Sequence, residues 1–292
     1  MTDGSNTKPA IDPSWYNKIV RSHPDMVRID FSTAPLCNKA MLARGLAEYF
    51  KTQRLHPQEI EEWDRALLSG QPLSDIFIQK IRLSFAEGVL KDDLQTVDED
   101  ALTGTCGQLI FRWIRNQFFG DEIIYASPKI LTDSSTEHGI DYFEILGNPL
   151  DQASLYFVVW EIKATDRDVT TRTNEIYQMH KKRSPRLLRG LELQLSLEYP
   201  KDEYPVLGTF VQQLLDHWLQ DTPAKRIGGA VVFDAGNHPG EVFTTFRRQF
   251  PNLHSSACRQ AILVEIPDFP QTRRELWTYL QAQISCPQTQ IF

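Results

Sequence analysis

The spacing of apolar residues predicts helices in the first third of the chain. Leu42, Leu46 and Phe50 recur at intervals of four, which is the period of a helix that buries one face. Ser74 precedes a similar apolar run and is a typical helix-capping residue. The pattern predicts helices over residues 38–53, 57–68 and 74–90, preceded by a short strand over 26–32 and by a tail and entry segment over 1–25.

Beyond Gly120 the apolar spacing shifts from near four to two. The run SLYFVVWEIK over 154–163 combines β-branched and aromatic residues, a composition typical of a strand that is buried on both faces. Further alternating or apolar runs predict strands before and after it, with helices between. The predicted strands cover 122–126, 139–146, 154–163, 227–234 and 261–267, and the predicted helices cover 104–119, 174–184, 187–199, 206–219 and 272–284.

This order of elements predicts an α/β fold in which a mixed central sheet is flanked by helices. The acidic segment KDDLQTVDED over 91–100 is predicted to be a linker. The sequence therefore predicts two regions, an N-terminal and mostly helical region over 1–100 and an α/β domain over 101–292.

Composition narrows the classes of function. Of the 292 residues, 41% are hydrophobic and 24% are charged, and the formal net charge is −7. A protein that coats nucleic acid is usually basic, so polyanion binding here requires a local basic patch. A nuclease, by contrast, is compatible with an acidic chain, because carboxylates are its metal ligands and the metal supplies positive charge.

The cysteines and the apolar runs bear on the compartment. The four cysteines lie far apart with no CxxC pair, which argues against a structural zinc site or a disulfide framework. No stretch approaches eighteen uninterrupted apolar residues, and MTDGSNTKPA carries no apolar leader core. We therefore expect a cytoplasmic protein with reduced thiols and no membrane segment.

Two charged residues lie at the end of the most apolar strand that the sequence predicts. Glu161 and Lys163 are two positions apart, so in a strand they project from one face. A charge buried in an apolar strand costs several kcal/mol unless it is paired or coordinates a metal. The position of these two residues therefore points to an ion pair or to a metal site.

Asp141 supplies a second carboxylate. It lies in the preceding predicted strand, and Gly147, Asn148 and Pro149 form a turn-like return that would bring it beside Glu161. With the main-chain carbonyl of Ile162, the two carboxylates offer hard oxygen ligands suited to Mg²⁺ or Mn²⁺. Such a metal polarises a phosphate and activates water, and Lys163 is placed to orient that water or to stabilise developing charge.

These residues resemble the PD-(D/E)xK nuclease superfamily. Asp141 and the tripeptide Glu161-Ile162-Lys163 match its pattern on predicted strands with helices on either side, over roughly residues 104–268. The resemblance implies a restriction-endonuclease-like core and Mg²⁺-dependent cleavage of nucleic acid by Asp141, Glu161 and Lys163. Within the superfamily, Gly-Ile-Asp at 139–141 and Trp-Glu-Ile-Lys at 160–163 are similar to the nuclease subunit of Hachiman-type antiphage defence, which implies a helicase partner.

One position departs from the superfamily pattern. Many members carry a glutamate on the helix before the strands as a further metal ligand, whereas this chain has Gln108 there. An amide oxygen can bind a metal or its water but brings no charge. Gln108 therefore puts a second metal site in doubt and lowers the expected strength of catalysis.

Several polar residues after the main strand are accessory candidates. Gln178 and His180 lie on the predicted helix that follows, within reach of a phosphate or a metal-bound water, although a lone helical histidine is more often a packing or surface residue. The densest basic cluster of the chain comes next and is either a contact for a nucleic-acid backbone or a solvated helix face. It comprises Lys181, Lys182, Arg183, Arg186 and Arg189.

The sequence leaves three functional hypotheses and one structural interpretation. The first is a metal-dependent nuclease of low sequence specificity, with DNA favoured and a partner that controls it. The second is a nuclease-fold adaptor that binds nucleic acid with weak or absent catalysis, which Gln108 favours. The third is an enzyme that acts on a small phosphoester. In the structural interpretation Glu161 and Lys163 form only an ion pair at the strand edge and Asp141 caps a turn.

Overall fold

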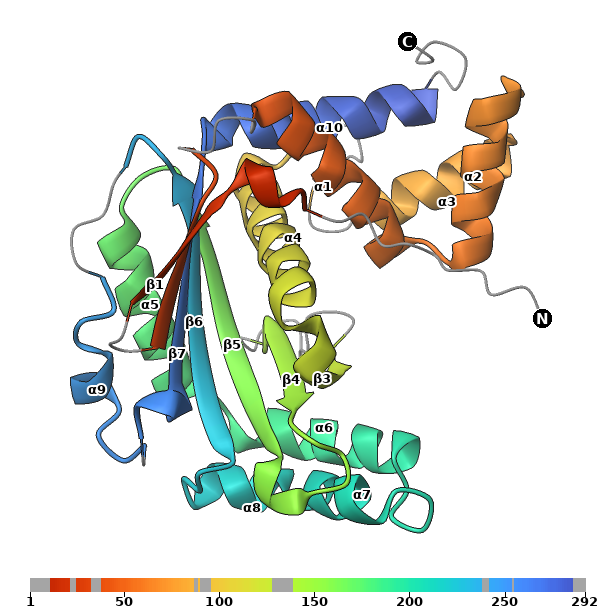
Figure 1. The fold of residues 1–292 in the computed structure, drawn as a ribbon. Coiled ribbons are helices and arrows are strands. Elements are labelled where there is room, and N and C mark those ends of the chain that lie inside the picture. The colour runs from red at the N-terminus through yellow and green to blue at the C-terminus, as the bar shows by residue number, and fades with distance from the viewer. Residues whose placement is uncertain are drawn as a thin grey trace.

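A computed structural model describes residues 11–21, 25–32, 38–86, 89, 96–127, 139–237, 242–253 and 255–285. Seven strands form one mixed sheet in the order β1-β2-β7-β6-β5-β4-β3 (Figure 1). The strands are β1 (Asn17–Arg21), β2 (Asp25–Asp30), β3 (Ile123–Ala126), β4 (Tyr142–Leu146), β5 (Tyr156–Thr165), β6 (Lys225–Asp234) and β7 (Arg259–Ile266). The pairs from β2 through β7 and β6 to β5 are parallel, and the remaining pairs are antiparallel. The predicted mixed α/β fold is confirmed.

Helices cover both faces of this sheet. The described helices are α1 (Lys39–Arg54), α2 (Pro57–Ser69), α3 (Asp75–Ala86), α4 (Glu99–Phe119), α5 (Val169–Lys182), α6 (Pro185–Glu198), α7 (Pro205–Val211), α8 (Leu214–Leu219), α9 (Phe246–Gln249) and α10 (Phe269–Ser285). One apolar core joins the sheet to helices α1–α4 and α10, and a second joins the opposite face to α5–α9. Figure 1 shows α4 lying along the sheet, with α1 and α10 stacked across its upper end.

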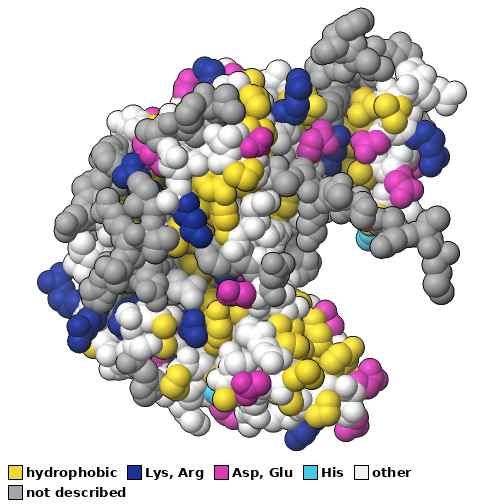
Figure 2. Space-filling view, in the orientation of Figure 1, with side chains coloured by type: hydrophobic (Ala, Val, Ile, Leu, Met, Phe, Trp, Pro, Cys, Tyr) yellow, Lys and Arg dark blue, Asp and Glu magenta, His cyan; other side chains and the backbone are white. Residues whose placement is uncertain are grey.

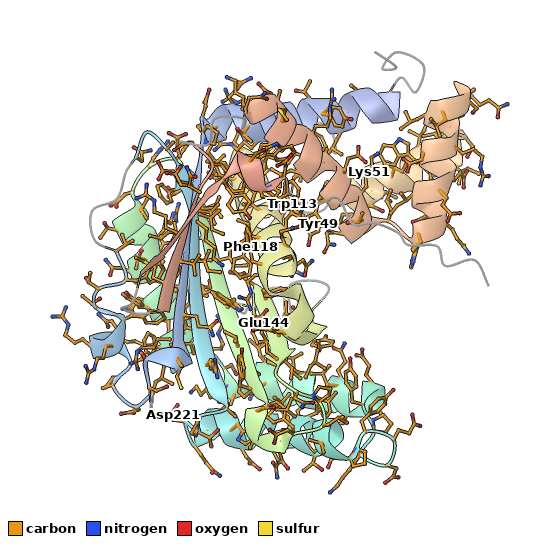
Figure 3. All side chains as sticks on the ribbon, viewed as in Figure 1. Tyr49, Lys51, Trp113, Phe118, Glu144 and Asp221 are labelled. Carbon is orange, nitrogen blue, oxygen red and sulfur yellow. The ribbon has the colours of Figure 1, made fainter. Side chains whose placement is uncertain are left out.

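The described residues among the first hundred are built into the same sheet and core as the rest of the described chain. β1 and β2 form its outer strands beside β7, and α1 packs against α4 through Tyr49 and Trp113, whose rings stack at 6.0 Å (Figure 3). The helical region predicted over 1–100 therefore shares its hydrophobic core with the predicted domain 101–292. Residues 91–95 of the predicted linker 91–100 lie outside the described residues, and its last two residues, Glu99 and Asp100, belong to helix α4.

The observed elements differ from the predicted ones at identifiable positions. β1 arises in the segment predicted to be a tail and entry segment. The helix predicted over 206–219 is two helices, because the chain leaves helical geometry at Gln213. Helix α4 begins earlier than predicted, since the Asp98 carboxylate accepts the amide hydrogens of Asp100 and Ala101 and caps it. No helix within the described ranges is long and apolar enough to cross a membrane.

Gly107 sets how closely α4 approaches the central strand. A Cβ atom at this position would lie 2.5 Å from the Cβ of Ala164 on β5, whereas one at Gly104, a turn earlier on the same helix, would meet nothing within 4 Å. We expect Gly107→Ala to lower the free energy of unfolding by about 1–3 kcal/mol through overpacking. Gly104→Ala is the matched control and should raise it by up to about 1 kcal/mol. Urea denaturation of both variants tests this prediction. Equal changes in the free energy of unfolding would show that the close contact between Gly107 and Ala164 does not make Gly107→Ala destabilising.

Candidate active site

The hairpin of β4 and β5 places Asp141 beside Glu161. Tyr142 pairs with Trp160 in the antiparallel register, so the residue that precedes β4 lies opposite Glu161. The Asp141 Oδ2 atom accepts the main-chain N–H of Ile162 at 2.7 Å. The two strands thus return on each other as the turn residues of the sequence predicted, and the two carboxylates lie next to each other.

Glu161 is buried between two cations. Only 1% of its surface is exposed. Its Oε1 atom lies 2.7 Å from the Nζ atom of Lys163, and its Oε2 atom accepts from Nη2 of Arg183 at 2.5 Å. The guanidinium of Arg183 is itself buried. The charge of Glu161 is therefore balanced by residues of this chain, one of them partly open to solvent and one enclosed.

Burial and the neighbouring charges shift the pKa values of Asp141 and Lys163. Burial and the neighbouring Glu161 carboxylate raise the pKa of Asp141 to about 7. Burial lowers the pKa of the Lys163 ammonium, but the carboxylates of Glu161 and Asp141 raise it by more, so that its pKa lies above the ordinary value. Lys163 is thus held as a cation, and Asp141 takes up a proton near neutral pH.

The raised pKa of Asp141 predicts a stability that depends on pH. Because the folded state binds this proton more tightly than the unfolded state, the stabilisation is present at low pH and is lost as the pH rises from about 4 to about 7. We expect the free energy of unfolding of the wild type, relative to Asp141→Asn, to fall across this range by at most about 1.4 kcal/mol per pH unit. Denaturation of both proteins across the range checks this, and parallel curves would contradict it.

Helix α4 holds Asp141 from the other side. Gln108 Nε2 approaches Asp141 Oδ1 at 3.4 Å, which is a long contact. Arg112, one turn later, donates from Nη2 to the main-chain oxygen of Asp141 at 3.0 Å and from Nη1 to that of Ser127 at 2.6 Å. Arg112 was not among the site residues predicted from the sequence. Its spacing of four from Gln108, which places both on one helix face, was the signal that pointed to it.

The donor chemistry of the cluster fits one hard divalent cation. Within the described ranges, no group of three or more His, Cys, Asp or Glu side chains is placed to bind a metal ion. Mg²⁺ is nevertheless commonly held by one or two carboxylates, with water and phosphate oxygens completing the shell. The adjacent carboxylates of Asp141 and Glu161 meet that minimum, and burial, the main cause of the raised pKa of Asp141, penalises a carboxylate charge that a bound cation would stabilise. The neutral amide of Gln108 contacts Asp141. A glutamate at this position would add the negative charge that favours binding of a second cation.

The accessory candidates on α5 are placed differently from one another. His180 is buried, and its Nε2 atom lies 2.8 Å from the main-chain oxygen of Gly228. Burial and the nearby Arg183 lower its pKa to about 3, so it is neutral. Gln178 is exposed. His180 therefore joins α5 to β6, and no described contact links either residue to Asp141 or Glu161.

The basic cluster after β5 separates into two parts. Lys181, Lys182 and Arg186 are exposed, in keeping with the predicted surface patch, and Arg189 is also exposed. Arg183 instead turns inward to Glu161. It was predicted to face a nucleic-acid backbone, but in the structure it is part of the carboxylate site. The cause is the buried charge of Glu161, because Lys163 contacts only one of its two carboxylate oxygens and Arg183 contacts the other.

A separate buried ion pair lies on the opposite face of β4. Glu144 is fully buried, accepts from the guanidinium of Arg115 on α4 and accepts the indole N–H of Trp160 at 2.8 Å. Figure 3 labels Glu144 where β4 passes beside α4. Burial raises the pKa of Glu144, and Arg115 opposes that shift. Since strand residues alternate faces, this pair is separated from Asp141 by the sheet.

The thiols of Cys106 and Cys258 are free and buried, whereas Cys37 and Cys286 lie outside the described residues.

The sequence was also compared with known proteins. It matches no protein-family model and no curated protein.

Proposed function

We propose that the chain is a metal-dependent nuclease that cleaves phosphodiester bonds, with Asp141, Glu161 and Lys163 as its catalytic residues. The observation that carries the proposal is the convergence of two adjacent carboxylates and a lysine on the β4–β5 hairpin. DNA is the favoured substrate, cut with low sequence specificity. The acidic chain and the lack of a base-reading motif support the low sequence specificity.

The carboxylates of Asp141 and Glu161 and the main-chain oxygen of Ile162 would hold Mg²⁺ or Mn²⁺. When bound, the cation supplies Lewis-acid polarisation of the phosphate and a more acidic water. Lys163, which is partly exposed and held as a cation by Glu161, offers an ammonium to the phosphate oxygens. Arg112 fixes the main chain at Asp141 and so keeps its carboxylate in place.

A second function is favoured by the state of Glu161. Both of its oxygens already contact cations, and Arg183 is enclosed with it. A metal ligand that is balanced in this way competes less well for a divalent cation, and Gln108 adds no charge. These features support the alternative of an adaptor that keeps the nuclease fold and binds nucleic acid with weak or absent cleavage.

Cleavage assays separate the two functions. Supercoiled plasmid and single-stranded DNA would be incubated with the protein in Mg²⁺, in Mn²⁺ and in a chelator, with Lys163→Ala as the test variant and Lys201→Ala, at an exposed position away from the site, as a matched control. Metal-dependent cutting that Lys163→Ala abolishes and Lys201→Ala retains supports the nuclease. Binding of DNA without metal-dependent cutting supports the adaptor. Turnover of small phosphodiesters alone would support neither and would select the third hypothesis.

The proposed partner is a helicase, and an antiphage role would place the protein in the cytoplasm. The resemblance of residues 139–141 and 160–163 to Hachiman-type nucleases supports both parts of this proposal. Co-expression with a candidate helicase, followed by the same cleavage assay, measures whether the partner raises the rate. Failure to co-purify would remove the partner from the proposal, and an unchanged rate for a co-purified complex would remove its control of cleavage.

A further inference from the structure

A basic pocket lies between α9 and the start of β7, apart from the carboxylate site. It is open to solvent and has a volume of about 860 Å³. Figure 2 shows Lys and Arg side chains on the flank of the molecule where α9 lies in Figure 1. Its eight lining residues include three arginines and three hydroxyl side chains and no Asp or Glu. The polar ones are Thr244, Arg247, Arg248, Ser255, Ser256 and Arg259.

Arg259 is the buried base of this pocket. Only 4% of its surface is exposed. Its Nη1 atom donates to the main-chain oxygen of Leu253 at 3.2 Å, while its Nε atom has no partner. No carboxylate of the described residues forms an ion pair with it. An enclosed guanidinium keeps its charge, and leaving that charge without a counter-ion is costly. Arg259 therefore presents a buried positive charge that an anion from outside the chain would balance.

Two further arginines stand at the rim. Arg247 and Arg248 are exposed on α9, and neither forms an ion pair with a carboxylate in the described part of the chain. A guanidinium presents a planar fork of donors that matches the oxygens of a phosphate, and the hydroxyls of Ser255 and Ser256 add neutral donors. In a chain of net charge −7, three arginines around one opening form a local exception to the overall charge.

The pocket is distinct from the carboxylate site but lies on the same side of the sheet. The parallel register aligns Arg259 with Ile227 on β6. Arg259 is two residues before Ala261 on β7 and so shares its face of the sheet, and both Ile227 and Ala261 belong to the core under α5–α9. β6 separates β7 from β5, which carries Glu161. The Nζ atom of Lys181 donates to Gln249 Oε1 at 2.5 Å, so the exposed end of α5 adjoins α9. The basic residues after β5 and the pocket thus form neighbouring parts of one surface.

We propose that this pocket binds a phosphate group, with Arg259 at its base and Arg247 and Arg248 at its rim. The phosphate is either a diester of a nucleic-acid strand or a free phosphate or phosphomonoester, since both offer the same tetrahedral oxygens. The proposal does not rest on cleavage at Asp141 and Glu161. A catalytically inactive chain would still bind the phosphate group.

Calorimetric titration in a chelator, at low salt, tests the pocket without cleavage. The probes are inorganic phosphate and a short single-stranded oligodeoxynucleotide that lacks terminal phosphates, so that only diesters are present. The test protein is the full chain carrying Arg247→Gln and Arg248→Gln. Arg65→Gln, an exposed arginine on α2, is the matched control, and Arg259→Lys keeps the charge but loses the fork. Thermal melts confirm that each variant is folded.

The outcomes assign or reject the site. If oligonucleotide affinity falls by about tenfold or more in the double variant, with the salt slope reduced by about one per arginine, the ligand is a nucleic-acid strand. If only phosphate binding is lost, the pocket stands and its ligand is a free phosphate or monoester. If wild type binds neither probe, if the double variant binds both as wild type does, or if Arg65→Gln weakens binding equally, the proposal is overturned. If Arg259→Lys fails to fold, the double variant of the exposed Arg247 and Arg248 alone tests the proposal.

Discussion

Glu161→Gln is expected to lower the rate of metal-dependent cleavage by at least about a hundredfold and the free energy of unfolding by about 3–5 kcal/mol. The first effect follows from the loss of one of the two carboxylates of the proposed metal site. The second follows because Arg183, buried with Glu161, would be left as an enclosed charge without a counter-ion. Plasmid cleavage and urea denaturation measure the two effects on the same preparation.

A double variant separates catalysis from stability. Glu161→Leu with Arg183→Met removes both buried charges, so it should recover much of the lost stability without recovering cleavage. Glu175→Gln, which breaks the half-exposed pair with Arg172, is the stability control and should cost less than about 1 kcal/mol. Full cleavage by Glu161→Gln would remove this residue from the catalytic proposal. A stability cost as small as that of the surface control would mean that solvent reaches Arg183.

Arg115→Met is expected to lower the free energy of unfolding by about 3–5 kcal/mol at neutral pH, because it leaves Glu144 buried without its cation. Burial already raises the pKa of Glu144, and Arg115 opposes that shift. In the variant the pKa rises further, so the folded state favours the protonated acid. The cost is therefore smallest at low pH and grows as the pH rises.

Denaturation of Arg115→Met and wild type at several pH values, followed through tryptophan fluorescence, measures this dependence, since the Trp160 indole also bonds to Glu144. Arg65→Met, at an exposed position, should change stability little at any pH. A cost that stays constant with pH would show that Glu144 does not change its protonation when Arg115 is removed.

The parts of the fold that depend on local pattern were predictable. The apolar run of β5 and the helical spacing of α1 and α2 determine those elements from neighbouring residues, and their observed bounds lie within about two residues of the predicted ones. β1 was missed because the segment Asn17–Arg21 carries three polar residues in five. Its pairing with β2 at the edge of the sheet decides its structure, and no local pattern encodes that pairing.

The candidate site was predictable only where the chain turns back on itself. Asp141 and Glu161 are joined by a short hairpin, so their proximity follows from turn residues and strand alternation. Arg183 and Arg112 reach the same place from helices on opposite faces of the sheet. Their approach depends on how α5 and α4 pack, which single-chain periodicity does not specify. Asp141, Glu161 and Lys163 were therefore predicted as one site, whereas Arg183 was predicted to face nucleic acid and Arg112 was not predicted.

The parallel pairing of β2 with β7 has a consequence for how the protein is made. Arg28 and Glu265, which form an ion pair across these strands, are 237 positions apart. At ribosomal rates of about 5–20 residues per second, β2 leaves the ribosome roughly 10–50 s before its partner strand exists. Such distant pairing also slows the search for the native arrangement. During this interval the edge of β2 that pairs with β7 has no partner strand, and an unpaired strand edge is a site at which chains associate.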